Sequence, residues 1–221
     1  MRKLIILLIV LIVLLVAVDR VAVSGVQRDI ANRIAAASDL SGTPTVTIEG
    51  IPFLTQAIAG RYQEVRFDLG TLTYNSVKVE NLSGAAYDVR APLADVIQNK
   101  AQIVAGRVSV RGTLSRSTVD RFAPRGVKIG GTGDTLTASG EVNLGVTKVK
   151  FTADMRVELV DGGIRVTAEK VNGMPAKAAG LLSYTIPLKA KLPFDVKVTG
   201  VKTVPAGLEI TAEASDVPLR G

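Results

Sequence analysis

The chain has 221 residues and a formal net charge of +7, and it contains no cysteine and no histidine. These absences exclude disulfides, thiol catalysis, Ser-His-Asp and Cys-His catalytic arrangements and most zinc sites. The excess of positive charge fits an anionic membrane surface as a partner. Nucleic acid is not expected, because the chain has no tryptophan and only nine other aromatic residues to stack on bases. We therefore expect a protein that is not an enzyme and that needs no cofactor or metal.

The N-terminus carries a strongly apolar segment. Arg2 and Lys3 precede an unbroken apolar run of fifteen residues, Leu4–Val18, which ends at Asp19 and Arg20. A positive start followed by such a run is typical of a secretory signal or an N-terminal anchor. A spanning helix usually needs about 20 apolar residues, so this run is short for a permanent anchor. The first 23 residues are interpreted as a signal peptide or membrane anchor, which predicts export to the outer face of the cytoplasmic membrane. Cleavage of the leader is left open.

Residues 24–221 are long enough for one domain with a single core. Helical periodicity follows the leader directly, with Val26, Ile30 and Ile34 spaced by four residues. Ser24 is a suitable cap, and Ser41-Gly42 lies where the pattern ends. The sequence therefore predicts a separate helix over residues 24–40, packed by one face on the domain; the alternative is an interfacial helix just outside the membrane.

Most of the remaining chain alternates between apolar and polar residues, which is typical of antiparallel strands with one dry face. The clearest example is Thr147–Val160, in which Val149, Phe151, Met155 and Val157 share a face. At about 3.4 Å per residue this strand would extend roughly 45 Å. Shorter alternating segments cover residues 45–49, 65–69, 77–80, 107–111, 194–204 and 208–214. Helical or irregular segments are expected at residues 52–59, 92–104, 115–122 and 174–188. Together they predict an α+β fold with a long, strongly curved antiparallel sheet.

The expected dry face is made mostly of Val, Ile, Leu and Ala. Such a core packs densely if two sheets close on each other. It leaves a long apolar cavity if a helix holds them apart. The residues alone leave both arrangements open, and with them the alternative of a structural or adaptor protein that has a closed core.

Two stretches resemble a known family. The first is Gly50–Gln56, of sequence G-I-P-F-L-T-Q, and the second is the closing set Leu192–Phe194, Gly207–Ile210 and Asp216–Leu219. They resemble blocks of the LmeA-like family of actinobacterial cell-envelope phospholipid-binding proteins. The resemblance implies a tubular lipid-binding fold of the bactericidal/permeability-increasing type, in which a curved sheet wraps a helix and encloses an apolar tunnel for acyl chains. It also implies a phospholipid partner and a role in lipomannan elongation.

This resemblance turns the apolar face into a predicted lining for acyl chains. The predicted lining residues are Phe53, Leu54, Phe67, Val149, Phe151, Met155, Val157, Leu181, Leu182 and Phe194. For Phe53 and Leu54 a second interpretation is open, in which they only close one end of the core.

Overall fold

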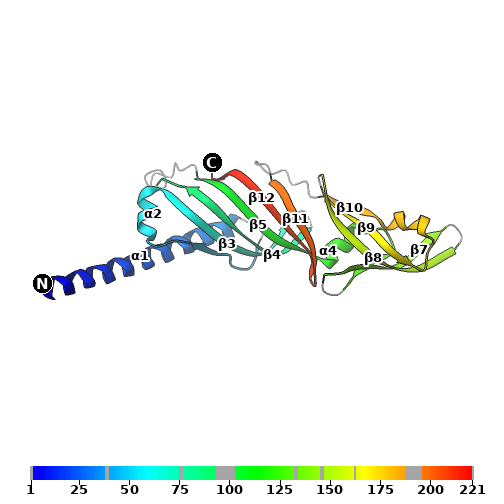
Figure 1. Cartoon of the computed structure of the whole chain (residues 1–221), viewed down its shortest axis with the longest axis horizontal. Helices are drawn as coiled ribbons and strands as arrows, with labels where there is room; N and C mark the ends of the chain where they lie inside the picture. The colour runs from blue at the N-terminus through cyan, green and yellow to red at the C-terminus, as the bar shows by residue number, and fades with distance from the viewer. Residues whose placement is uncertain are drawn as a thin grey trace. The chain divides into compact units, whose positions relative to one another are not determined.

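A computed structural model describes residues 2–37, 40–74, 77–92, 103–131, 134–144, 147–161, 163–187 and 196–220 (Figure 1). In chain order its elements are α1 (Arg2–Ala37), β1 (Leu40–Ser41), β2 (Thr45–Ile48), α2 (Phe53–Ala59), β3 (Arg61–Tyr74), β4 (Val77–Arg90), β5 (Ile103–Ser115), α4 (Arg116–Phe122), β6 (Val127–Gly130), β7 (Leu136–Leu144), β8 (Thr147–Val160), β9 (Gly163–Asn172), the 3-10 helix η1 (Ala176–Leu182), β10 (Tyr184–Pro187), β11 (Val196–Val204) and β12 (Gly207–Arg220).

The strands form two sheets. One has seven strands in the order β1-β3-β4-β5-β12-β11, with β2 paired to β3, and the other has five in the order β10-β9-β8-β7-β6. Every neighbouring pair of the five-stranded sheet is antiparallel, and so is the β2–β3 pair. The seven-stranded sheet is strongly curved, as its long strands in Figure 1 show. The predicted α+β class with a curved antiparallel sheet is confirmed.

Contacts divide the chain into two compact units. Unit 1 contains Met1–Gly70, Ser83–Val110 and Ala214–Gly221, and unit 2 contains Thr71–Leu82 and Arg111–Glu213. The prediction of a single domain over residues 24–221 stays a prediction. The two units are described separately below.

Unit 2 confirms the clearest strand prediction, since β8 spans Thr147–Val160. Phe151 and Met155 of β8 are buried, whereas the intervening Thr152 and Asp154 are exposed. β8 lies at the centre of the five-stranded sheet. Its buried face belongs to a core cluster made of Leu114, Val119, Val127, Ile129, Leu136, Ala138, Phe151, Ala153, Met155, Ile164, Val166, Leu182, Ile186 and Leu208.

Two of the predicted short helices are confirmed. α2 begins directly after Pro52 and ends at Gly60, whose left-handed conformation (φ +65°) suits glycine. α4 begins after Ser115, whose side chain accepts a hydrogen bond from the backbone N–H of Thr118. The helix expected over residues 92–104 falls largely outside the described residues, and its last two positions belong to β5.

The prediction of a separate helix beginning at Ser24 is wrong. α1 is one continuous helix of 36 residues from Arg2 to Ala37. Ser24 lies inside it, and its hydroxyl donates to the backbone oxygen of Arg20 at 2.8 Å instead of capping a new helix. The predicted apolar stripe also shifts, because Val26 is exposed whereas Val23 and Ala31 are buried. Since no proline interrupts residues 2–37, the helix has no reason to stop at the end of the apolar run.

Candidate functional site

In unit 1, α1 packs against α2 and β2. The core of this contact is formed by Val23 of α1, Ile48 of β2, and Phe53 and Ala57 of α2, all buried. Phe53 and Ala57 lie one turn apart and therefore share the face of α2 that points into this cluster. The Phe53 ring also lies 6.1 Å from that of Tyr62. We call this contact the α1–α2 seam.

A carboxylate from α1 joins the two helices at the seam. Asp19, only 3% exposed, accepts a 2.7 Å hydrogen bond from the backbone N–H of Leu54. The first N–H groups of a helix have no partner within the helix, and the residue before α2, Pro52, provides no side-chain cap. Asp19 therefore caps α2 from a distant part of the chain. The guanidinium of Arg20 pairs with the same carboxylate, so that the buried charge is compensated.

The glutamine at the end of the G-I-P-F-L-T-Q block fixes the chain on both sides of α2. The Gln56 side chain donates to the backbone oxygen of Glu49 at 2.9 Å and accepts from the backbone N–H of Gln63 at 3.0 Å. A Cβ atom at Gly50 would lie 2.7 Å from the Gln56 amide nitrogen, and Gly50 has a φ of +96°. Only glycine fits both conditions without strain. In this structure the block therefore builds the platform on which α1 packs.

Phe67 lies on the face of the curved sheet that α1 covers. β2 pairs with β3 so that Val46 stands opposite Phe67 and Ile48 opposite Val65. Directly paired residues of antiparallel strands share a face, and Ile48 packs with Val23 of α1. Phe67 is half-buried. A Cβ atom at Gly84 would lie 2.7 Å from its ring, so the missing side chain there makes room for the aromatic ring.

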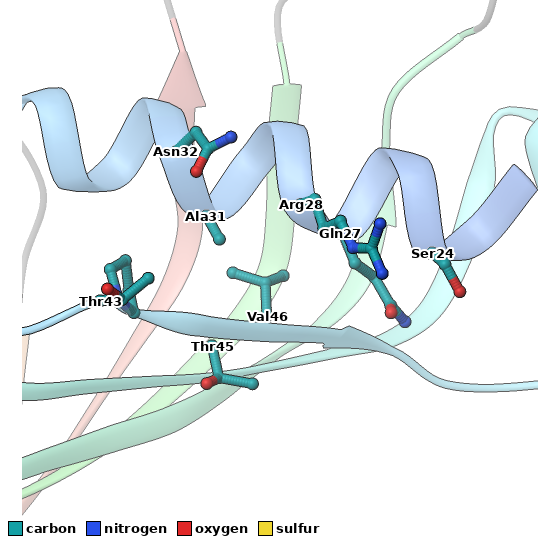
Figure 2. Close-up of a pocket in the computed structure, with 9 residues that line it drawn as sticks. Ser24, Gln27, Arg28, Ala31, Asn32, Thr43, Thr45 and Val46 are labelled. Atoms are coloured by element: carbon teal, nitrogen blue, oxygen red, sulfur yellow. The ribbon is translucent and has the colours of Figure 1, made fainter.

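A groove of about 440 Å³ runs between α1 and β2 (Figure 2). Figure 2 shows Ala31 of α1 and Val46 of β2 pointing toward one another across it. Polar and apolar residues both line it: Ser24, Gln27, Arg28, Ala31 and Asn32 from α1, and Thr43, Pro44, Thr45 and Val46 from the β2 segment. Its volume is within the range of small-ligand sites. Amides, hydroxyls and one guanidinium suit a polar, anionic group better than an acyl chain.

The predicted lining residues fall into separate sets. Phe53, Leu54 and Phe67 lie in unit 1, with Phe53 and Leu54 at the seam with α1. In unit 2, Phe151, Met155 and Leu182 are buried in the core cluster, Val157 packs against it, Val149 is partly buried, and Leu181 is 57% exposed. Phe194 lies outside the described residues. The assignment of these residues to acyl-chain contact stays a prediction.

Sequence reasoning missed three side chains that define this region: Asp19, Arg28 and Gln56. Asp19 was interpreted only as the end of the apolar run, because its partner is 35 positions away. An acidic residue directly after an apolar run of fifteen residues is the signal that could have prompted a search for a partner. Gln56 belonged to the recognised block, but no local pattern indicates its two backbone partners.

Unit 2 contains a buried hydroxyl without a partner among the described residues. The Tyr184 Oη and the Arg116 Nε atoms are both buried and have no hydrogen-bond partner there. Burial, and secondly the nearby Asp120 carboxylate, raises the pKa of Tyr184 well above its usual value. No cluster of three or more metal-ligating acidic side chains occurs in the part of the chain that the structure describes.

Comparison with known proteins identifies the family. The model of the LmeA-like phospholipid-binding family matches residues 17–213. The chain belongs to this family. The matched region of the LmeA-like chain includes Asp19, the whole of α2, and Phe67, and it leaves out most of the apolar run. No curated protein and no solved structure gives a significant match.

Proposed function

We propose that this LmeA-like protein is held at the outer face of the cytoplasmic membrane by α1 and binds phospholipid there without catalysing a reaction. The family match over residues 17–213 carries the proposal. The curved sheet supports it, because its α1-covered face is lined by apolar side chains. α1 is long and apolar enough to cross a membrane. A role in lipomannan elongation stays a prediction from the resemblance.

The acyl chains are proposed to lie on the α1-covered face of the curved sheet in unit 1, beside Phe67. On β4, Gly84 faces the Phe67 ring, and the buried Ala86, two residues further on, lies on the same face. Small side chains along a curved surface leave more room for an apolar ligand than large ones. Each methylene removed from water contributes about 0.8 kcal/mol, so acyl chains alone supply ample affinity.

The phosphate is proposed to bind in the groove between α1 and β2. Arg28 lines this groove and has no ion-pair partner among the described residues. The other nearby guanidinium, Arg33, is paired with Asp29 at 2.7 Å. Arginine binds phosphate oxygens through charge-assisted hydrogen bonds, and the Gln27 and Asn32 side chains that also line the groove can donate further ones.

Photo-crosslinking with a phosphatidylcholine that carries a diazirine on its acyl chain tests the proposal. Trypsin cuts after Arg66 and Lys150, so the peptides that begin at Phe67 and at Phe151 are separated by their masses. We expect label on the peptide that begins at Phe67. Label on the peptide that begins at Phe151 would move the acyl site to unit 2. Absence of label from every peptide, at lipid concentrations that label a control lipid-binding protein, would contradict phospholipid binding.

A further inference from the structure

The seam between α1 and α2 carries a group of exposed apolar side chains. Among the described residues outside Leu4–Val18, three large apolar side chains are more than 70% exposed: Val21, Ile51 and Ile58. Val21 lies on α1 about 200° around the helix from Val23, and so faces away from α2. Ile51 directly precedes α2, and Ile58 lies within it. Isolated exposed apolar residues are common, but Ile51 and Ile58 lie directly before and within the helix that packs on α1 in unit 1.

The length of the apolar run determines how deep the α1–α2 seam lies in a membrane that α1 spans. At 1.5 Å per residue, the fifteen residues of Leu4–Val18 span about 22 Å. The hydrocarbon core of a bilayer is about 30 Å thick. About five further residues are needed to fill it, which extends the membrane-embedded part of α1 to Val23. Asp19 and Val23 are both buried against α2. When α1 inserts to this depth, α2, which is packed against it, is therefore placed in the interfacial layer.

Exposed cations lie beside α2. The backbone N–H of Ala91 donates to the oxygen of Gly60, the residue that ends α2, at 2.9 Å. The two residues that flank this hydrogen bond, Arg61 and Arg90, are both exposed. They form a basic edge beside the end of α2. Exposed arginines next to exposed isoleucines suit the boundary between anionic headgroups and acyl chains.

We infer that α2 and the preceding Ile51 form a second membrane contact, inserted into the outer leaflet beside α1 and held there by Asp19. Ile58 lies one turn after Leu54 on the same face of α2, so the hydrogen bond that holds Leu54 also fixes the direction of Ile58. Arg61 and Arg90 contact the lipid phosphates. The partner of this surface is the anionic lipid bilayer itself. The inference rests on the proposed membrane anchoring and is independent of the acyl-chain site.

The absence of tryptophan makes a direct test possible. Single-tryptophan variants of the full chain are placed in vesicles of phosphatidylcholine and phosphatidylglycerol, with or without bromine on the acyl chains. Ile58→Trp reports on α2, and Leu11→Trp reports on insertion of α1. Ser41→Trp is the control. It is exposed and lies next to Gly70, nine residues or about 30 Å along β3 from Arg61.

Brominated lipid is expected to quench both Leu11→Trp and Ile58→Trp, and to leave Ser41→Trp unchanged. The emission of Ile58→Trp should also shift to shorter wavelength. Quenching of Leu11→Trp without quenching of Ile58→Trp overturns the inference and leaves the anchoring intact; a protein partner would then be the candidate occupant of this surface. If Leu11→Trp is not quenched either, the proposed anchoring fails as well. Because Ile58 is 77% exposed, its replacement does not disturb the core.

Discussion

The side-chain carboxylate of Asp19 accepts a 2.7 Å hydrogen bond from the backbone N–H of Leu54. This bond connects the end of the apolar run to the first turn of α2, 35 positions later. The last residues of the predicted leader therefore pack on α2 in unit 1.

Loss of the Asp19 carboxylate should free the first turn of α2. In Asp19→Ala the Leu54 N–H has no partner from α1, and an unpaired donor at the start of a short helix favours opening. We expect its amide hydrogen to exchange roughly tenfold faster, as measured by hydrogen–deuterium exchange. Asp29→Ala is the matched control, since Asp29 forms only an exposed pair with Arg33 on the same helix. Equal exchange at Leu54 in all three proteins would contradict a capping role.

Two shortened chains should differ in stability. A chain that begins at Asp19 keeps both Asp19 and Val23, whereas a chain that begins at Gly25 loses both. Burial of a valine side chain contributes about 1.5–3 kcal/mol, so the shorter chain should have a free energy of unfolding at least about 2 kcal/mol lower. Chemical denaturation measures the difference. If the two chains unfold at the same denaturant concentration, the packing of Val23 on α2 does not stabilise the domain.

Arg28 should govern the preference for anionic headgroups. Replacement by glutamine removes the guanidinium from the groove and keeps a polar side chain of similar reach. We expect Arg28→Gln to bind fluorescent phosphatidylglycerol about tenfold more weakly, as for loss of one charged hydrogen bond. Arg33→Gln should bind normally, because Arg33 is already paired with Asp29. Equal affinities for Arg28→Gln and the unaltered protein would place the phosphate elsewhere.

Tyr184→Phe should stabilise unit 2 and alter its response to high pH. Its hydroxyl is buried without a partner among the described residues, so removal should raise the free energy of unfolding by about 1 kcal/mol. Burial raises the pKa of Tyr184 above the unfolded value. The folded state therefore keeps its proton longer, and stability falls as the pH rises above about 10. Thermal unfolding between neutral and alkaline pH should show a smaller fall in Tyr184→Phe; an unchanged or steeper fall would contradict the raised pKa.

Structural features that depend on residues close together in the sequence could be predicted, and features that depend on distant residues could not. The boundaries of β8 were visible because alternation is a property of adjacent residues. α2 was visible because Pro52 and Gly60 are local signals for its two ends. The continuity of α1 through Ser24 could not be predicted, because serine caps a helix in one context and is tolerated inside a helix in another.

The candidate site was less predictable than the elements that form it. That Phe67 faces α1 depends on the register of β2 against β3, which pairs it with Val46. Short alternating segments do not define such a register. The distribution of the predicted lining residues over two units was equally hidden, because alternation marks a dry side of a strand without showing what covers it.

The proposed binding of phospholipid to the α1-covered face of the curved sheet is tested by native mass spectrometry of a chain that begins at Asp19, expressed in bacteria and purified gently. Phe67→Gln places a polar side chain on that face, and Thr47→Gln places the same side chain on the opposite face of the adjacent strand. We expect phospholipid on the unaltered chain and on Thr47→Gln, and much less on Phe67→Gln. Lipid-free protein in all three preparations, or equal lipid content in the two variants, would contradict the claim.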